Sequence, residues 1–201
     1  ASAEDNAAYW SIATTMRSDN KALSTVQDAL GLGKATVNVA YTAINSSIDV
    51  TSEIKAKLVA AREPGVDRSK IQSEVKELQN QLKSVADSAS FSGQNWLSVD
   101  SSAASYNATK SIVASFTRDS TGAVTVGTIS VDTAATKLYD SSATAAGILD
   151  ATRDATGAIA ATGASIASLD ISTLTDSAVD LATLDGYIKG SDKAITEMTS
   201  A

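Results

Sequence analysis

The sequence predicts an α+β fold: an elongated antiparallel helical coiled-coil rod that carries a β-hairpin and a small irregular outer region. Three observations predict it. Apolar residues repeat every seven positions over the N-terminal third, a second apolar stripe follows a Pro-Gly turn at 64–65, and apolar residues alternate with polar ones between 110 and 131. A helix with so long an apolar stripe must lay it along other helices. We therefore expect a structural, assembly-type protein.

The first helix is expected to span about Asp5 to Arg62, a length of roughly 90 Å at 1.5 Å per residue. Ser2 and Asp5 form a capping box at its start, and Pro64 with Gly65 ends it. Its heptad is Met16, Leu23, Leu30, Val37, Ile44 and Leu58, interrupted by Thr51. A second register four residues earlier holds Ile12, Val26, Ala40 and Ile54, interrupted by Asp19, Gly33 and Ser47. We expect the first register to form the rod core.

A second helix is expected to begin near Asp67 or Ser69 and to run to about Ser90, with Gln72 at the reciprocal position of its capping box. The turn before it is short, so this helix must fold back antiparallel on the first. A third helix is expected from about Thr173. The remaining predicted core residues lie on these two helices: Ile71, Val75, Leu78, Leu82, Leu174, Leu181, Ile188 and Ile195.

The predicted domains are an N-terminal helical hairpin (1–100), a β-hairpin (101–131), a variable outer region (132–172) and a C-terminal helix (173–201). Residues 118–122 supply the turn of the β-hairpin. Residues 132–168 are rich in Ala, Thr, Ser, Gly and Asp and hold few large apolar groups. We expect either a small irregular subdomain or a flexible loop here, which lies on the outside and tolerates replacement.

Composition excludes several classes of function. The 201 residues include no His, no Cys and one Pro, and the formal net charge is -7. An acidic chain without clustered Lys and Arg is unsuited to nucleic acid, and no apolar run is long enough for a membrane span. Carboxylates such as Glu53 and Glu77 lie on helices as solvated-face charges, and Gly31–Lys34 lacks the spacing of a phosphate loop. We expect no enzyme activity, no cofactor and no metal.

Two segments resemble a known family. The chain opens Ala-Ser-Ala-Glu-Asp-Asn-Ala-Ala (1–8), and Phe-Ser-Gly-Gln-Asn (91–95) follows the second helix. This pattern resembles bacterial flagellin. The continuation over 5–13 and Met-Arg-Ser-Asp (16–19) is similar to the rhizobial branch of that family. The similarity covers 1–100, 110–131 and 173–201, whereas 132–168 matches only in character.

The resemblance implies a structural subunit of the flagellar filament, secreted, extracellular and polymerising with other flagellin subunits. It also allows an export chaperone as a partner. Relative to the family, the terminal segments that form the innermost tube of the filament are absent, so we expect a core fragment in which the stripe around Ile12, Met16, Leu23 and Val26 finds no partner in its own chain. Two alternatives stay open: a hook-filament junction protein and a surface adhesin on the same frame.

Overall fold

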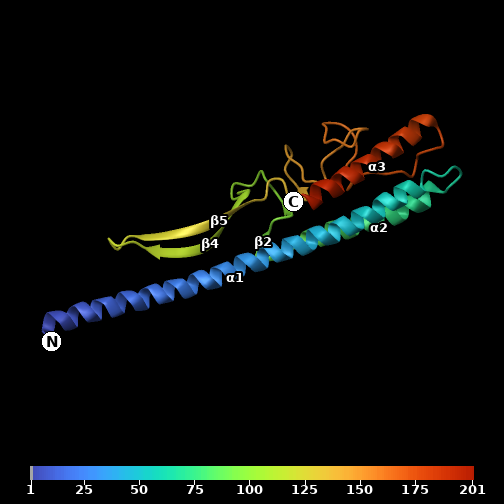
Figure 1. Cartoon of the computed structure of the whole chain (residues 1–201). Coiled ribbons are helices and arrows are strands. Elements are labelled where there is room, and N and C mark those ends of the chain that lie inside the picture. The colour runs from blue at the N-terminus through green and yellow to red at the C-terminus, as the bar shows by residue number, and fades with distance from the viewer. Residues whose placement is uncertain (1) are drawn as a thin grey trace. The chain divides into compact units, whose positions relative to one another are not determined.

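The computed structural model describes residues 2–201 and contains three helices and six strands within that range. The helices are α1 (Ala3–Ala60), α2 (Arg68–Ser88) and α3 (Ala178–Thr199), as Figure 1 shows. The strands are β1 (Ser90–Phe91), β2 (Gln94–Asn95), β3 (Ser98–Val99), β4 (Thr109–Arg118), β5 (Val124–Asp132) and β6 (Tyr139–Asp140). The predicted α+β class is confirmed.

The chain divides into two compact units. The hairpin unit combines the N-terminal residues up to Val37 with Thr109–Val131, and the three-helix unit combines Asn38–Ala108 with Asp132–Ala201. Helix α1 therefore contributes to both units, and the predicted N-terminal domain of residues 1–100 is shared between them.

The start of α1 has the predicted capping box. The backbone N–H of Asp5 donates to Ser2 Oγ at 3.2 Å, and the Ser2 N–H donates to Asp5 Oδ2 at 3.1 Å. Two N–H groups that have no partner within the helix are thereby satisfied. At the other end α1 stops four residues before Pro64, as the sequence predicts.

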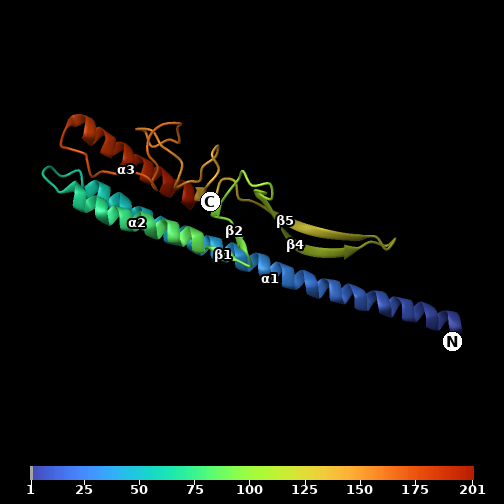
Figure 2. The same ribbon diagram turned by 180° about the vertical axis from the view of Figure 1, so that it is seen from behind.

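Helix α2 runs antiparallel to α1, as predicted. Lys57 of α1 pairs with Glu74 of α2 at 2.6 Å, and Arg68 Nε donates to the Ala61 carbonyl at 3.0 Å, so residue numbers rise in opposite directions. Figures 1 and 2 both show α2 lying along the C-terminal part of α1. The N-cap is Asp67, whose carboxylate accepts from the N–H groups of residues 69 and 70. The capping role predicted for Gln72 is wrong, because its side chain bonds to residues 169 and 171.

Helix α3 also lies antiparallel to α1. Asp185 pairs with Arg62 at 2.7 Å and Asp192 pairs with Lys55 at 2.7 Å. This helix begins at Ala178, a few residues later than predicted, because Ser177 caps it and accepts from the Asp180 N–H. Its buried face consists mostly of small residues, Gly186, Gly190, Ser191 and Ala194. Leu184 and Met198 are the two large side chains on this face.

The predicted β-hairpin is present as β4 and β5, which pair in a two-stranded sheet. Its turn is closed by the Asp119 N–H donating to the Ala123 carbonyl at 2.9 Å, and Gly122 adopts a φ of 86° that favours glycine. At the base of the hairpin, the N–H and hydroxyl of Thr133 both donate to the Ala108 carbonyl.

Residues 132–172, expected as an outer region, contribute side chains to the core. The short strand β6 pairs in parallel with β3, and the surrounding loops are pinned by backbone hydrogen bonds. This stretch supplies several side chains that are at least nine-tenths buried: Leu138, Tyr139, Ile148, Leu149, Ala151, Ile166, Leu169 and Ile171. Glycines allow this density. A Cβ on Gly147, for instance, would collide with the Leu138 carbonyl. A segment with low apolar content is therefore closely packed within the three-helix unit.

Candidate assembly surface

The face of α1 that packs inside its own chain follows the second sequence register rather than the first. Along this inner seam every residue is half-buried or buried, with alternating steps of three and four: Asp19, Ala22, Val26, Ala29, Gly33, Thr36, Ala40, Ala43, Ser47, Val50 and Ile54. Most of these side chains are small. The three interruptions that the sequence shows in this register, at 19, 33 and 47, therefore lie on the packed face.

The β4–β5 hairpin contacts two of these interrupting residues, Asp19 and Gly33. The Arg118 guanidinium at the end of β4 binds Asp19 through two nitrogens, with Nη2 at 2.8 Å and Nε at 3.2 Å from Oδ1. This hydrogen bond lowers the pKa of Asp19 and raises that of Arg118. Farther along α1, the side chain of Ile112 lies where a Cβ of Gly33 would be. The hairpin thus docks on α1 through a carboxylate and a missing side chain.

The third interruption lies in the three-helix unit. Ser47 is fully buried, and its hydroxyl donates to the Ala43 carbonyl one turn earlier at 2.8 Å. Its small side chain leaves room for the neighbouring helices while its polar group is satisfied within α1. Thr51, which interrupts the first register, is also fully buried, and its Oγ1 finds no hydrogen-bond partner within residues 2–201.

The first register forms a stripe beside the inner seam, and we call it the flanking stripe: Tyr9, Met16, Leu23, Leu30, Val37, Ile44, Thr51 and Leu58. From residue 23 to residue 51, each member directly follows a seam residue. The exposed fraction falls steadily along it, from 78% at Tyr9 through 61% at Met16 and 43% at Leu23 to 0% at Leu58. Its members in the three-helix unit, Ile44, Thr51 and Leu58, are half-buried or fully buried, whereas those in the hairpin unit are exposed.

The predicted core residues consequently fall into three groups. Leu58, Val75 and Leu82 are fully buried. Half-buried positions are Ile44, Ile71, Leu78, Leu174, Leu181, Ile188 and Ile195. Exposed positions are Met16, Leu23, Leu30 and Val37, which differ from the predicted core because the hairpin docks on the inner seam beside them.

Further large apolar groups extend the exposed area. Trp10 is 68% exposed, Ile12 60% and Tyr41 66%. The expectation that the proximal part of α1 has no partner in its own chain is only partly met, because Val26 is half-buried on the inner seam. An exposed row of large apolar side chains at heptad spacing is typical of a surface that another helix covers.

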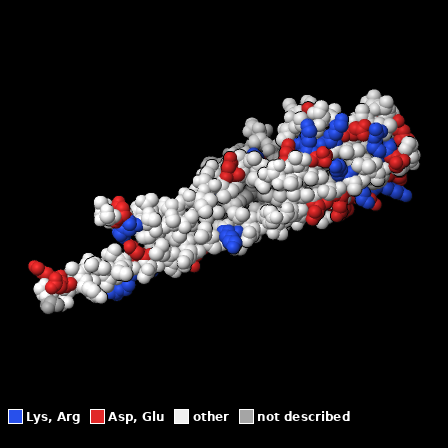
Figure 3. Space-filling view, viewed as in Figure 1, with Lys and Arg blue, Asp and Glu red and all other residues white. Residues whose placement is uncertain are grey.

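Many charged side chains lie over α3 and the segments beside it. Figure 3 shows Lys and Arg interspersed with Asp and Glu over α3 and the segments beside it, with no extended patch of one sign on this face. Ion pairs such as Arg62–Asp185 and Lys55–Asp192 account for part of this pattern.

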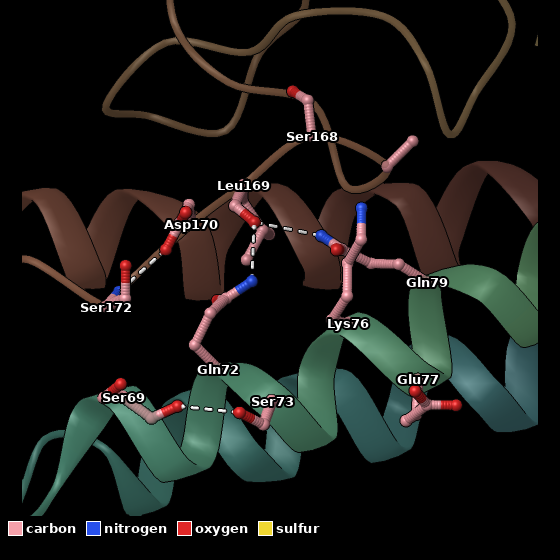
Figure 4. Close-up of a pocket in the computed structure, with 11 residues that line it drawn as sticks. Ser69, Gln72, Ser73, Lys76, Glu77, Gln79, Ser168, Leu169, Asp170 and Ser172 are labelled. Atoms are coloured by element: carbon pink, nitrogen blue, oxygen red, sulfur yellow. Dashed lines mark hydrogen bonds between the residues drawn. The ribbon is translucent and has the colours of Figure 1, made fainter.

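Two glutamine side chains cross a groove beside α2. A groove of about 470 Å³ lies between α2 and residues 167–172. Figure 4 shows that Gln72 and Gln79 reach across it, and Gln79 Nε2 donates to the carbonyls of Ile166 and Leu169 at 3.0 Å. These amides hold the segment on α2. Within residues 2–201 no cluster of three or more acidic residues could hold a metal ion, and no helix is long and apolar enough to cross a membrane.

Comparison with known proteins agrees with this architecture. The family model for the N-terminal helical region of bacterial flagellin matches residues 1–102, which is about half of the chain. The chain belongs to the bacterial flagellin family. The matched range covers α1, α2 and the short strands after them, so the family is recognised from the helical part that carries the inner seam and the flanking stripe.

Individual flagellins share much of the sequence. The chain is 63% identical to flagellin C of Rhizobium meliloti (strain 1021) over 147 residues and 59% identical to flagellin A of the same strain over 151 residues. These matches cover 73% and 74% of this chain but only 45% and 37% of the relatives. A flagellin of Brucella melitensis biotype 1 is 45% identical over 117 residues, which are 56% of this chain and 42% of that protein. The chain thus spans less than half of the length of these relatives.

Proposed function

We propose that this chain is part of a structural subunit of the bacterial flagellar filament, exported from the cell and polymerising with other flagellin subunits outside it. The observation that carries the proposal is the exposed part of the flanking stripe, five large side chains from Tyr9 to Val37 at heptad spacing. Burying the exposed remainder of each one contributes on the order of 1 kcal/mol. Together they make a contact surface worth several kcal/mol.

The proposal includes no enzymatic step and no cofactor. Support comes from the polar side chains near the grooves, which make hydrogen bonds and ion pairs within the chain. Gln72 and Gln79 bind backbone groups, and Lys83 pairs with Asp87 at 2.7 Å. Before export, an export chaperone that shields the same stripe is a further proposed partner, since apolar surface of this kind promotes premature association.

The test is a polymerisation assay on the protein as the bacterium exports it. Leu23→Ser with Leu30→Ser makes the flanking stripe polar at two exposed positions, and Ile159→Ser, at a loop position that is 59% exposed, is the matched control. We expect the double variant to lower the yield of seeded filaments at least tenfold and the control to leave it unchanged. Circular dichroism of the monomers checks that α1 is intact. Filament yields equal to those of the parent protein would contradict the proposal.

A second measurement separates the proposal from its two rivals. Antibody labelling of intact cells should mark the filament along its whole length. Labelling confined to the base of the filament would favour the hook-filament junction protein, and labelling of the cell surface without filaments would favour the adhesin.

A further inference from the structure

One heptapeptide pattern occurs twice in the chain. Residues 118–124 read Arg-Asp-Ser-Thr-Gly-Ala-Val, and residues 153–159 read Arg-Asp-Ala-Thr-Gly-Ala-Ile. The first copy forms the turn of the β4–β5 hairpin, in the hairpin unit. The second lies in the loops between β6 and α3, in the three-helix unit. We call this pattern the turn module.

Both copies fold into the same hydrogen-bonded turn. In each, the Asp carboxylate accepts from the Thr N–H at 2.8 Å, from the Thr hydroxyl at 2.6 Å and from the following Ala N–H at 2.9 or 3.2 Å. These bonds, led by the one from the Thr hydroxyl, lower the pKa of Asp119 and of Asp154. The Gly residues have φ values of 86° and 83°. Four features, three hydrogen bonds and one glycine conformation, thus repeat at equivalent positions.

Each copy also presents its Arg in the same way. One guanidinium nitrogen donates to the carbonyl of the module's own Gly, at 2.9 Å in the first copy and 3.1 Å in the second. The other terminal nitrogen binds a carboxylate on a helix: Asp19 of α1 at 2.8 Å or Glu197 of α3 at 2.6 Å. The module is therefore a device that fastens a turn to an acidic residue on a helix.

The two fastenings differ in their surroundings. The Arg153 side chain is 2% exposed, its aliphatic stem lies against Gly190, and a Cβ on Gly157 would come within 2.7 Å of the Lys189 carbonyl. In the first copy the side chains of Arg118 and Asp19 are 31% and 27% exposed, and a Cβ on Gly122 would meet nothing within 4 Å. Helix α3 encloses the second copy, whereas α1 meets the first copy at the ion pair.

The rest of the hairpin adds little burial. None of residues 109–131 is fully buried, and the hairpin side chains that turn towards α1, such as Ile112 and Phe116, are half-buried. A two-stranded ribbon on its own is marginally stable in water. Its attachment therefore depends strongly on the Arg118–Asp19 pair, and an ion pair with this exposure is weakened by salt.

We propose that β4–β5 is a strap that Arg118 and Asp19 latch onto α1, and that raising the ionic strength releases it. The second copy of the module, enclosed by α3, stays fastened under the same conditions. Release exposes the half-buried seam residues Ala22, Val26 and Ala29 next to the flanking stripe, and so enlarges the apolar face of α1. This inference does not depend on the proposed function.

Hydrogen exchange measured by mass spectrometry tests the latch. The parent chain is compared at about 0.02 M and about 0.5 M sodium chloride, between which the screening length falls from about 20 Å to about 4 Å. We expect amide exchange in 109–132 to become roughly twofold to fivefold faster at high salt. Exchange in residues 147–166, which contain the second copy, is expected to change less than that.

Variants separate the latch from general effects of salt. Asp19→Asn removes the charge but leaves the turn itself intact, and Asp28→Asn, at an exposed position of the same helix, is the matched control. At low salt, Asp19→Asn should show the fast exchange that the parent shows at high salt, and it should lose the salt response; Asp28→Asn should behave like the parent. Arg118→Gln must repeat the result from the other partner. Unchanged protection at residues 50–60 verifies the fold. A parent hairpin that is insensitive to salt, or identical exchange in the two Asn variants, would overturn the proposal.

Discussion

Gly33 of α1 lies so close beneath Ile112 of β4 that a Cβ on the glycine would come within 2.5 Å of Ile112 Cγ2. The two residues are 79 positions apart in the sequence, and both belong to the hairpin unit. A glycine inside a helix is unfavourable by about 1 kcal/mol relative to alanine. At this position the missing side chain is what lets the strand approach the helix.

This contact predicts opposite outcomes for two neighbouring glycines. Gly31→Ala meets nothing within 4 Å, so it should gain helix propensity and stabilise α1 by up to about 1 kcal/mol. Gly33→Ala should gain less or destabilise the hairpin unit, because Ile112 must move. Thermal unfolding followed by circular dichroism and hydrogen exchange in 109–132 measure both effects. In an Ile112→Ala background the difference between the two variants should disappear; if it persists, the collision is not its cause.

Thr51 is predicted to weaken the three-helix unit. Its side chain is fully buried and its hydroxyl has no partner within the described part of the chain. Thr51→Val keeps the shape and removes the unsatisfied group, so it should stabilise the chain by about 1 to 2 kcal/mol, measured by urea unfolding. Thr36→Val is the control, because the Thr36 hydroxyl donates to the Leu32 carbonyl at 3.0 Å. Equal effects of the two substitutions would show that hydroxyl satisfaction is not decisive.

The second turn module should be essential to the three-helix unit. Arg153 donates to the carbonyls of Ile148 and Gly157 as well as to Glu197. Arg153→Met removes these bonds and leaves buried carbonyls unsatisfied, so unfolding free energy should fall by about 2 to 4 kcal/mol. Arg118→Met, the same change in the exposed copy, should lower global stability much less. Comparable losses from the two variants would contradict the difference in enclosure.

Acid should weaken the packing around β6 through Asp140. Burial alone would raise the pKa of this carboxyl, but Lys137 at 2.5 Å and the N–H groups of Ser101 and Ser142 together hold it well below its usual range. Because the folded pKa is below the unfolded value of about 3.9, the contribution to stability is complete above about pH 5 and is lost as the pH falls through the folded pKa.

Asp140→Asn should therefore lower stability at neutral pH and flatten the loss of stability between about pH 4 and pH 2. Urea unfolding across this range measures it. Asp49→Asn, at an exposed position of α1, controls for the change in net charge. A variant as steeply acid-sensitive as the parent chain would show that other groups govern acid unfolding.

Local sequence determined most of the secondary structure. The capping box at Ser2 and Asp5, the stop before Pro64 and the turn at 118–122 each act over a few residues, so their geometry follows from the residues themselves. The repeated turn module is also visible in the sequence, as Arg-Asp-x-Thr-Gly-Ala followed by Val or Ile at 118–124 and 153–159. Apolar periodicity does not reveal it, because most of its residues are polar or small.

Only the tertiary structure decided which register of α1 faces inward. Periodicity shows that residues share one side of a helix, but it does not show which element covers that side. The β4–β5 hairpin covers α1 by placing Arg118 against Asp19 and Ile112 against Gly33. These contacts require a carboxylate at 19 and no side chain at 33, where a heptad pattern predicts large apolar residues. The larger residues from Met16 to Val37 are left outside. For the same reason residues 132–172, although poor in large apolar groups, supply buried side chains: close packing over glycines and the Arg153–Glu197 pair depend on contacts between distant segments.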